Sequence, residues 1–261
     1  MNILDKIVAD KHKEVQLKKQ HIPVQVYEQL PNFEMKTKSL SKQLLKSDSG
    51  IIAEFKRKSP SKSVINATAK VKDVAMGYET AGVCGMSILT DEIYFGGTMD
   101  DLLNARLCCN LPLLRKEFII DEYQIIESKS IGADAILLIA AILTRKQIKA
   151  FSELAKQLHL DVLLEVHNEE ELQKSMMPSI DMLGVNNRNL KTFEVSLEVS
   201  KLLSVQIPDD FVKVSESGIS SVEAIKDLKP YGYKGFLIGE NFMKTASPGR
   251  AAKIFIDELL K

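Results

Sequence analysis

The sequence predicts an α/β protein: a (β/α)8 TIM barrel with an N-terminal helical extension. Two observations support this prediction. Short apolar runs alternate with segments of helical periodicity, and each of these runs is apolar over nearly its whole length. Strands that are covered on both faces have this composition, and parallel sheets are covered on both faces. The chain has 261 residues, which fits one barrel, since α/β barrels often form a single unit of about 250 residues.

Eight apolar runs rich in Ile, Leu and Val are the expected strands. The runs are 51–55, 85–90, 111–115, 135–140, 161–166, 182–186, 212–215 and 235–238. Segments with helical periodicity lie between and after them, at 69–81, 98–107, 121–131, 144–157, 168–176, 196–204, 221–228 and 248–260. Asn168 and Ser220 stand where two of these helices should begin, and side chains of this type cap helix N-termini.

An open, doubly wound sheet is the structural alternative to the closed barrel. The barrel is favoured because the strand–helix units follow one another without a larger insertion. No Gly-x-Gly-x-x-Gly turn follows the first run, which weakens the case for a dinucleotide-binding fold.

A helical extension of residues 1–48 is expected to precede the barrel of residues 49–261, and the two are expected to form a single domain. Apolar residues recur among the charges of residues 1–20, which is typical of an amphipathic helix. These residues are Ile3, Leu4, Ile7, Val8, Val15 and Leu17. A polar connector with two prolines follows, and a short helix is expected near residues 40–45.

Composition excludes several classes of protein. The 35 Lys and Arg residues balance the 35 Asp and Glu residues, so no broad attraction to nucleic acid or to an anionic membrane is indicated. No apolar run approaches the ~20 residues of a membrane span, and the N-terminal segment lacks the apolar core of a signal peptide. The cysteines and histidines have neither disulfide nor metal spacing, so a metal-free protein of the reducing cytoplasm is expected.

Polar and charged residues gather at the C-terminal ends of the expected strands, where α/β barrels carry their active sites. Side chains alternate along a strand, so Glu54 and Lys56 share a face with Ile52. If such faces point inward, the barrel mouth holds cations and carboxylates together, namely Lys56, Lys116, Arg188, Glu54, Glu165 and Glu216. A single charged residue at a strand end is equally well explained as a solvated surface side chain. Charged residues at several strand ends favour an active site instead, because buried charges need partners.

The loops after the last two strands carry a separate signal. Ser-Glu-Ser-Gly-Ile at 215–219 and Leu-Ile-Gly-Glu-Asn at 237–241 each place a glycine shortly after a strand. In barrels these two loops often bind phosphate through backbone amides and the start of a short helix. Gly218 and Gly239 are also ordinary turn residues, but their presence in both loops favours a phosphorylated small-molecule ligand.

Together, these motifs resemble those of the indole-3-glycerol phosphate synthase family of tryptophan biosynthesis, nearly end to end. The most specific pieces are IIAEFKRKSPSK (51–62), SILTDEIYFGG (87–97), LLRKEFIIDEYQI (113–125), ILLIAAIL (136–143), LLEVHNEEEL (163–172), LGVNNRNLKTF (183–193), VSESGI (214–219) and FLIGENFM (236–243). The resemblance implies a lyase, a carboxy-lyase that cyclises 1-(2-carboxyphenylamino)-1-deoxyribulose 5-phosphate to indole-3-glycerol phosphate with loss of CO2 and H2O. It also implies lysine and glutamate general acid–base chemistry that uses no cofactor and no metal.

The resemblance implies roles for individual residues as well. Lys116 is the leading general acid, Glu165 is the general base, and Lys56 is a second catalytic lysine. Glu54 orients a lysine, and the division of steps between the two lysines stays open. The substrate-binding residues are Ser59, Phe95 (beside the anthranilate ring), Asn186, Arg188 and Glu216. The phosphate-binding residues are Ser217, Gly218, Gly239 and Glu240, mostly through backbone amides.

Three other charged or titratable residues near these motifs are given no chemical role. Arg57 and Lys58 are expected to face solvent or neighbouring carboxylates. His167 is the histidine nearest the expected mouth, and it is interpreted as a polar loop residue.

Two other functions stay open beside this one. A phosphoribosylanthranilate isomerase would share the barrel and the phosphate site, but it needs a different acid–base pair than Glu54, Lys56 and Lys116 supply. A non-catalytic phosphosugar-binding barrel would have no need for a full set of cations and carboxylates. The resemblance further leads us to expect a monomer, which could contact other enzymes of the tryptophan pathway.

Overall fold

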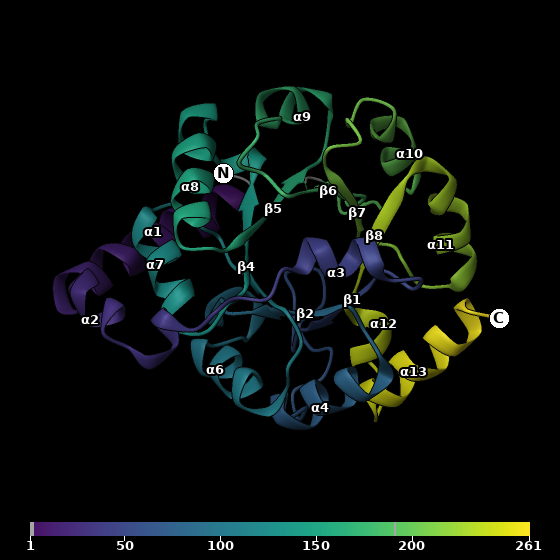
Figure 1. Cartoon of the computed structure of the whole chain (residues 1–261), viewed down its shortest axis with the longest axis horizontal. Helices are drawn as coiled ribbons and strands as arrows, with labels where there is room; N and C mark the ends of the chain where they lie inside the picture. The colour runs from purple at the N-terminus through teal and green to yellow at the C-terminus, as the bar shows by residue number, and fades with distance from the viewer. Residues whose placement is uncertain (1–2, 191) are drawn as a thin grey trace.

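Eight parallel strands close into a barrel in the computed structural model, which describes residues 3–190 and 192–261 (Figure 1). The strands are β1 (Ile51–Phe55), β2 (Gly85–Leu89), β3 (Leu113–Lys116), β4 (Ala135–Ile139), β5 (Asp161–Val166), β6 (Met182–Asn186), β7 (Val212–Glu216) and β8 (Tyr233–Ile238). Each strand pairs in parallel with the next, and β8 pairs with β1 to complete the barrel. The predicted (β/α)8 architecture is confirmed.

Every segment that showed helical periodicity within the barrel forms a helix. These helices are α4 (Val71–Ala81), α6 (Met99–Cys108), α7 (Glu122–Ser130), α8 (Arg145–Gln157), α9 (Glu169–Ser175), α10 (Glu198–Ser204), α11 (Val222–Leu228) and α13 (Pro248–Leu259). Periodicity did not reveal four shorter elements, α5 (Glu92–Phe95), η2 (Ala140–Ile142), η3 (Lys229–Tyr231) and α12 (Glu240–Met243). One helical turn is too short to show a period of 3.6 residues.

One of the two predicted helix caps is found where it was expected. The Asn168 side chain accepts a hydrogen bond from the backbone N–H of Glu171 at 2.9 Å, which caps α9. The prediction that Ser220 caps α11 is wrong, because Ser221 accepts from the backbone N–H of Ala224 at 3.3 Å instead. A capping side chain bonds to a backbone N–H in the first turn of its helix, so the cap is the residue directly before the helix. Because α11 begins at Val222, this residue is Ser221.

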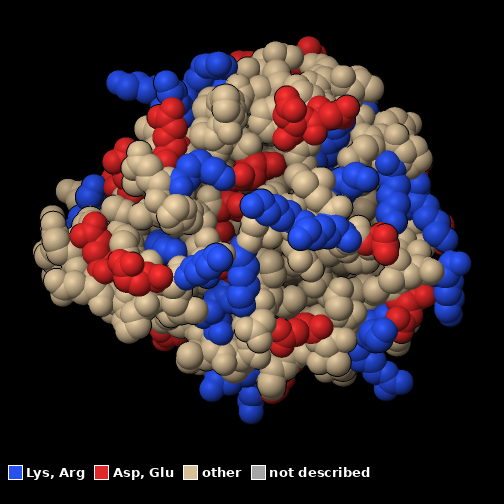
Figure 2. All heavy atoms as spheres, viewed as in Figure 1, with Lys and Arg blue, Asp and Glu red and all other residues tan. Residues whose placement is uncertain are grey.

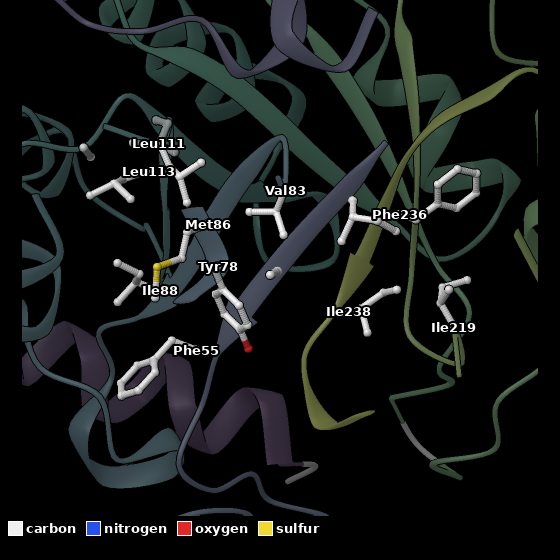
Figure 3. Close-up of a cluster of buried hydrophobic side chains, with 14 of the residues drawn as sticks. Phe55, Tyr78, Val83, Met86, Ile88, Leu111, Leu113, Ile219, Phe236 and Ile238 are labelled. Atoms are coloured by element: carbon white, nitrogen blue, oxygen red, sulfur yellow. The ribbon is translucent and has the colours of Figure 1, made fainter. Parts of the chain in front are cut away.

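The strands separate the core into a barrel interior and an outer layer under the helices. Ala53 and Phe55 of β1 belong to the outer layer with Tyr78 of α4. Figure 3 shows Phe55 and Tyr78 beside the strand. Ile52 belongs to the interior cluster. Because side chains alternate along a strand, Glu54 takes the same inward side as Ile52. The predicted alternation of β1 is therefore confirmed.

The N-terminal extension covers both ends of the barrel. Helix α1 (Ile3–His21) lies at the C-terminal ends of the strands, where Ile7 joins the interior cluster. The short helices α2 (Val24–Glu28) and η1 (Pro31–Glu34) then pass along α7. Helix α3 (Leu40–Lys46) covers the opposite end, which faces the viewer in Figure 1.

Both predicted helices of the extension are present, with one difference in the apolar face of α1. Ile7 and Val15 are buried, whereas Leu17 is 59 % exposed, so Leu17 does not belong to the buried face of α1. The first two residues of the expected helix lie outside the described residues. At the far end of the extension, Leu40 and Leu44 of α3 are fully buried in the interior cluster.

Lys and Arg side chains alternate with Asp and Glu over the face of the molecule that carries α3 (Figure 2). The formal net charge of the chain is zero. Of the helices that the structure describes, none combines the length and the apolar composition that a membrane span requires.

Candidate active site

A cavity of about 400 Å³ opens at the C-terminal ends of the strands, beneath α1. This volume lies in the range of small-molecule sites, which is about 300–1,000 Å³. Every residue that the sequence predicted for the site lines the cavity. These residues are Glu54, Lys56, Ser59, Phe95, Lys116, Glu165, Asn186, Arg188, Glu216, Ser217, Gly218, Gly239 and Glu240.

The Lys116 ammonium lies between two buried carboxylates. It is 3.2 Å from Glu165 Oε2, and it forms a second ion pair with Glu216 Oε2. The three groups come from β3, β5 and β7, so the closed barrel brings together alternate strands. Burial alone would lower the pKa of Lys116, but Glu216, Glu165 and Glu54 hold it above its ordinary value. Lys116 is therefore an ammonium that can donate a proton.

The two carboxylates beside Lys116, Glu165 and Glu216, differ in the direction of their pKa shifts. Burial alone would raise the pKa of Glu165, but Lys116 and then His167 hold it below its ordinary value. Burial raises the pKa of Glu216 although Lys116 opposes this, and the charge of Glu165 adds to the rise. Titratable groups whose pKa values are pushed apart in one site are typical of acid–base catalysis. Glu165 is the ionised member, and Glu216 takes up a proton more readily.

Another ion pair lies at the end of β1, between Lys56 and Glu54. Lys56 Nζ is 2.5 Å from Glu54 Oε1, and Glu54 is buried. A Cβ atom at Gly239 would lie only 2.6 Å from Glu54 Oε1, so the carboxylate occupies the space that a larger residue would need. Glycine at the end of β8 therefore lets Glu54 reach the cavity.

The loop after β1 is tied to the segment that follows the neighbouring strand, β8. Ser59 and Lys62 exchange backbone hydrogen bonds, at 2.8 Å and 3.0 Å. Lys62 Nζ is 2.7 Å from Glu240 Oε1 in α12, which joins this loop to the end of β8. Both side chains of this pair are half exposed, so the connection is weak and can open to admit a ligand.

Two polar residues at the end of β6 and just after it line the cavity. Asn186 accepts a hydrogen bond from the backbone N–H of Arg188 at 3.0 Å, and its side chain helps to lower the pKa of Glu165. The Arg188 guanidinium lines the cavity and donates to the backbone oxygen of Phe193 at 3.3 Å.

The predicted phosphate-binding residues lie together at the ends of β7 and β8. Ser217 and Gly218 are consecutive residues in the left-handed region, with φ of 65° and 78°. A left-handed serine is strained, and such strain is common at ligand sites. Gly239 directly precedes α12, whose first backbone N–H groups lack partners within the helix. The Glu240 carboxylate pairs with Lys62, so only its backbone could face a phosphate.

An apolar wall completes the cavity, and the sequence revealed only part of it. The rings of Phe95 and Phe118 lie 5.9 Å apart, and both line the cavity. Ile3, Leu4 and Ile7 of α1 lie on the same lining. The amphipathic pattern of α1 was visible in the sequence, but the pattern alone does not say which surface the apolar face covers.

Three residues that were given no chemical role have defined contacts. Arg57 Nη2 donates to Asp101 at 2.8 Å, which confirms the expected carboxylate, while Lys58 Nζ donates to the backbone oxygen of Ile93 at 2.8 Å. His167 follows β5 in a loop as expected, but its side chain is only 10 % exposed and lies beside Glu165. The interpretation of His167 as a simple polar loop residue was therefore incomplete.

Within residues 3–190 and 192–261, no cluster of three or more His, Cys, Asp and Glu side chains is arranged to hold a metal ion. The three cysteines, Cys84, Cys108 and Cys109, are free thiols. The chemistry that the cavity can perform with its own side chains is proton transfer and charge pairing.

Solved structures similar to this chain share its fold. KGPDC from Streptococcus mutans superimposes with a TM-score of 0.60 at 15 % identity, covering 81 % of this chain and 97 % of that chain. A chain of the tryptophan synthase a2b2 complex from Pyrococcus furiosus superimposes with a TM-score of 0.58 at 16 % identity, covering 82 % and 98 %. At these identities the likeness shows the barrel fold alone.

Sequence relatives are more specific. The family model described as indole-3-glycerol phosphate synthase matches residues 4–255. A protein of that name from Bacteroides thetaiotaomicron is 48 % identical over 255 residues, covering 98 % of each chain. Another from Caldanaerobacter subterraneus is 44 % identical over 243 residues, covering 93 % of each chain. The chain therefore belongs to the indole-3-glycerol phosphate synthase family.

Proposed function

We propose that the protein closes the indole ring of indole-3-glycerol phosphate from 1-(2-carboxyphenylamino)-1-deoxyribulose 5-phosphate. A bond forms between the ring carbon that bears the carboxylate and the ketone carbon of the sugar chain. CO2 then leaves from that ring carbon, and the hydroxyl derived from the ketone leaves as water together with a proton from the neighbouring methylene. The aryl nitrogen supplies the electrons, so the sequence of bonds needs no oxidant or reductant.

The observation that carries this proposal is Lys116, held as an ammonium between Glu165 and Glu216 in the cavity at the C-terminal ends of the strands. Ring closure requires a proton for the ketone oxygen, and Lys116 is assigned as the donor. Loss of water requires a base for the methylene proton, and the ionised Glu165 is assigned to accept it.

The remaining residues are assigned to hold the substrate. Lys56, paired with Glu54, lies where it can bind the substrate carboxylate or act as the acid of one step, and the division between the two lysines stays open. Asn186 and Arg188 face the sugar chain together with Ser59. Glu216 Oε1 has no hydrogen-bond partner among the described residues, so it can accept from a substrate hydroxyl.

The two ends of the substrate are assigned to opposite sides of the cavity. Phe95 belongs to the apolar wall with Phe118, which suits the anthranilate ring. Ser217, Gly218, Gly239 and Glu240 are assigned to the phosphate, through backbone N–H groups at the ends of β7 and β8. We further propose that the enzyme is cytoplasmic and monomeric, with contacts to other tryptophan-pathway enzymes as an additional hypothesis.

Indole fluorescence tests this function. Purified protein is mixed with the carboxyphenylamino substrate in the presence of a chelator, with no cofactor added. Growth of the fluorescence of indole-3-glycerol phosphate, with one CO2 released per product, is expected. Tight substrate binding without any fluorescence change would instead support the non-catalytic phosphosugar-binding barrel.

A further inference from the structure

His167 is a buried histidine that the proposed reaction does not use. It directly follows β5, two residues after Glu165, and its side chain is 10 % exposed. Its Nε2 atom lies 3.4 Å from Glu165 Oε1, on the side of the carboxylate away from the oxygen that Lys116 contacts. Nε2 has no hydrogen-bond partner within the described part of the chain. A buried polar atom without a partner calls for a reason.

The other nitrogen of the same ring is held by a carboxylate. His167 Nδ1 is 3.0 Å from Glu171 Oε2 in α9. The same Glu171 oxygen accepts from the His167 backbone N–H at 2.8 Å, and the other oxygen accepts from the Asn168 side chain at 3.1 Å. Glu171 is therefore fixed by three contacts, and it fixes the plane of the imidazole. A carboxylate that orients a histidine through Nδ1 leaves Nε2 aimed at its target.

We propose that His167 is a positioning residue for Glu165, holding Oε1 of this carboxylate while Lys116 holds Oε2. The proposal rests on the assignment of Glu165 as the base. Lys116 must leave Glu165 when it donates its proton to the substrate. The imidazolium of His167 then remains beside Glu165 and keeps the carboxylate ionised and oriented until it accepts the methylene proton.

The groups that face His167 favour the charged imidazole. Carboxylates approach it from three elements: Glu165 of β5, Glu171 of α9 and Glu216 of β7. Burial alone would lower the pKa of His167, but Glu171 and Glu165 outweigh burial and raise it above its ordinary value. The groove on the far side of the ring is lined by further charged or titratable side chains, namely Asp5, His12, Arg188 and Glu194.

A titration of the histidine ring protons by NMR tests the geometry without any turnover. Wild type, Glu165→Gln and Glu171→Gln are compared, with the exposed His12 and His159 as internal references. The His167 midpoint is expected above the ordinary ~6.5 in wild type and lower in each variant. A midpoint that Glu165→Gln leaves unchanged would overturn the proposal.

Turnover of two His167 variants tests the consequence. Asn can replace the Nδ1 donor to Glu171 but has no atom at Nε2, whereas Gln can reach toward Glu165 without a charge. His167→Asn is expected to lower kcat about tenfold, the effect of one pKa unit, with KM nearly unchanged. The acid limb of its pH profile should move to higher pH, and His167→Gln should recover part of the rate.

His159→Asn is the matched control, because His159 is exposed and has a left-handed φ of 59° that Asn tolerates. It should keep wild-type turnover. Glu165→Gln measured beside it separates two failures. If Glu165→Gln turns over normally, the proposed base is wrong, whereas an inactive Glu165→Gln beside a His167→Asn of wild-type rate and pH profile rejects only the role of His167.

Discussion

At the scale of single residues, two glycines decide where two carboxylates of the cavity, Glu54 and Glu216, can lie. A Cβ atom at Gly184 of β6 would lie 2.3 Å from Glu216 Oε1, and one at Gly239 would lie 2.6 Å from Glu54 Oε1. Real Cβ atoms do not approach other atoms so closely, so either carboxylate would have to move. These positions set the geometry of the site without contributing a side chain.

Gly184→Ala tests this role. The new methyl group should push Glu216 away from Lys116 and crowd Leu163, whose Cδ1 lies 3.1 Å from the same point. We expect a loss of about 1–3 kcal/mol in the free energy of unfolding, as overpacking generally causes, and a lower kcat. Urea unfolding and turnover measure the two effects.

A double-mutant cycle identifies the partner of this clash. If Glu216 is the group displaced, Gly184→Ala should cost less stability in a Glu216→Ala background than in wild type. Equal costs in the two backgrounds would show that Leu163 or the backbone, and not Glu216, bears the strain.

At the scale of elements, α1 closes the mouth of the barrel and is anchored there by one buried lysine. Lys11 Nζ pairs with Asp91 at 3.0 Å and Glu117 at 3.1 Å, and also with Glu14 of α1 itself. Asp91 precedes α5, and Glu117 directly follows Lys116. The anchor therefore joins α1 to the segments that carry Phe95 and Lys116.

Lys11→Met should weaken this anchor. The substitution removes the cation that the buried Asp91 and Glu117 share, and it leaves Glu117 with the more distant Arg115, at 3.9 Å. Breaking a buried ion pair in this way typically costs about 3–5 kcal/mol. We expect a lower midpoint of urea unfolding and faster protease cleavage within α1. Lys13→Met is the matched control on the same helix, because the Lys13 side chain is 79 % exposed. Similar losses in the two variants would show that helix content, and not the anchor, is responsible.

The sequence was sufficient where the signal is local. Strands such as β4 and β5 are buried on both faces, so their apolar runs stand out, and the charges that follow them mark the mouth. Contacts between distant segments left no such signal. The pairing of Lys11 with Asp91 and Glu117, the space that Gly184 leaves for Glu216, and the nearness of His167 to Glu165 depend on closure of the barrel.

At the scale of the whole molecule, one buried carboxylate ties the extension to the barrel. Glu127 of α7 pairs with Arg115 of β3 at 2.6 Å and with Lys18 of α1 at 3.1 Å. It also accepts a hydrogen bond from Tyr27 of α2 at 2.9 Å. Burial alone would raise the pKa of Glu127, but Arg115 and Lys18 lower it to about 2.

This lowered pKa predicts how stability depends on pH. A carboxyl group with pKa of about 4.3 in the unfolded chain and a lower value in the fold stabilises the protein above the unfolded pKa. The ionised Glu127 should therefore contribute about 3 kcal/mol to the free energy of unfolding, for a pKa lowered to about 2. This contribution should be lost as pH falls from the unfolded pKa to the folded pKa. Urea unfolding from pH 7 to about pH 2 measures it, and Glu127→Gln should show a flatter dependence of the free energy of unfolding on pH.

The dependence of the free energy of unfolding on pH must also be measured for a variant that lacks a surface carboxylate. Glu153→Gln serves as the control, since the Glu153 side chain is 53 % exposed and pairs within the described residues only with Lys149, at 3.9 Å. If Glu127→Gln and Glu153→Gln keep the same slope as wild type, Glu127 does not dominate the acid sensitivity.

The central claim is that Lys116, held between Glu165 and Glu216, is the proton donor of the ring closure, with Glu165 as the base. The most direct measurement is kcat of Lys116→Ala and Glu165→Gln, followed by indole fluorescence, beside substrate affinity measured separately. Each variant is predicted to bind substrate and to lose about 10²-fold or more in kcat, the usual contribution of one acid or base. Near wild-type turnover in both variants would contradict the claim.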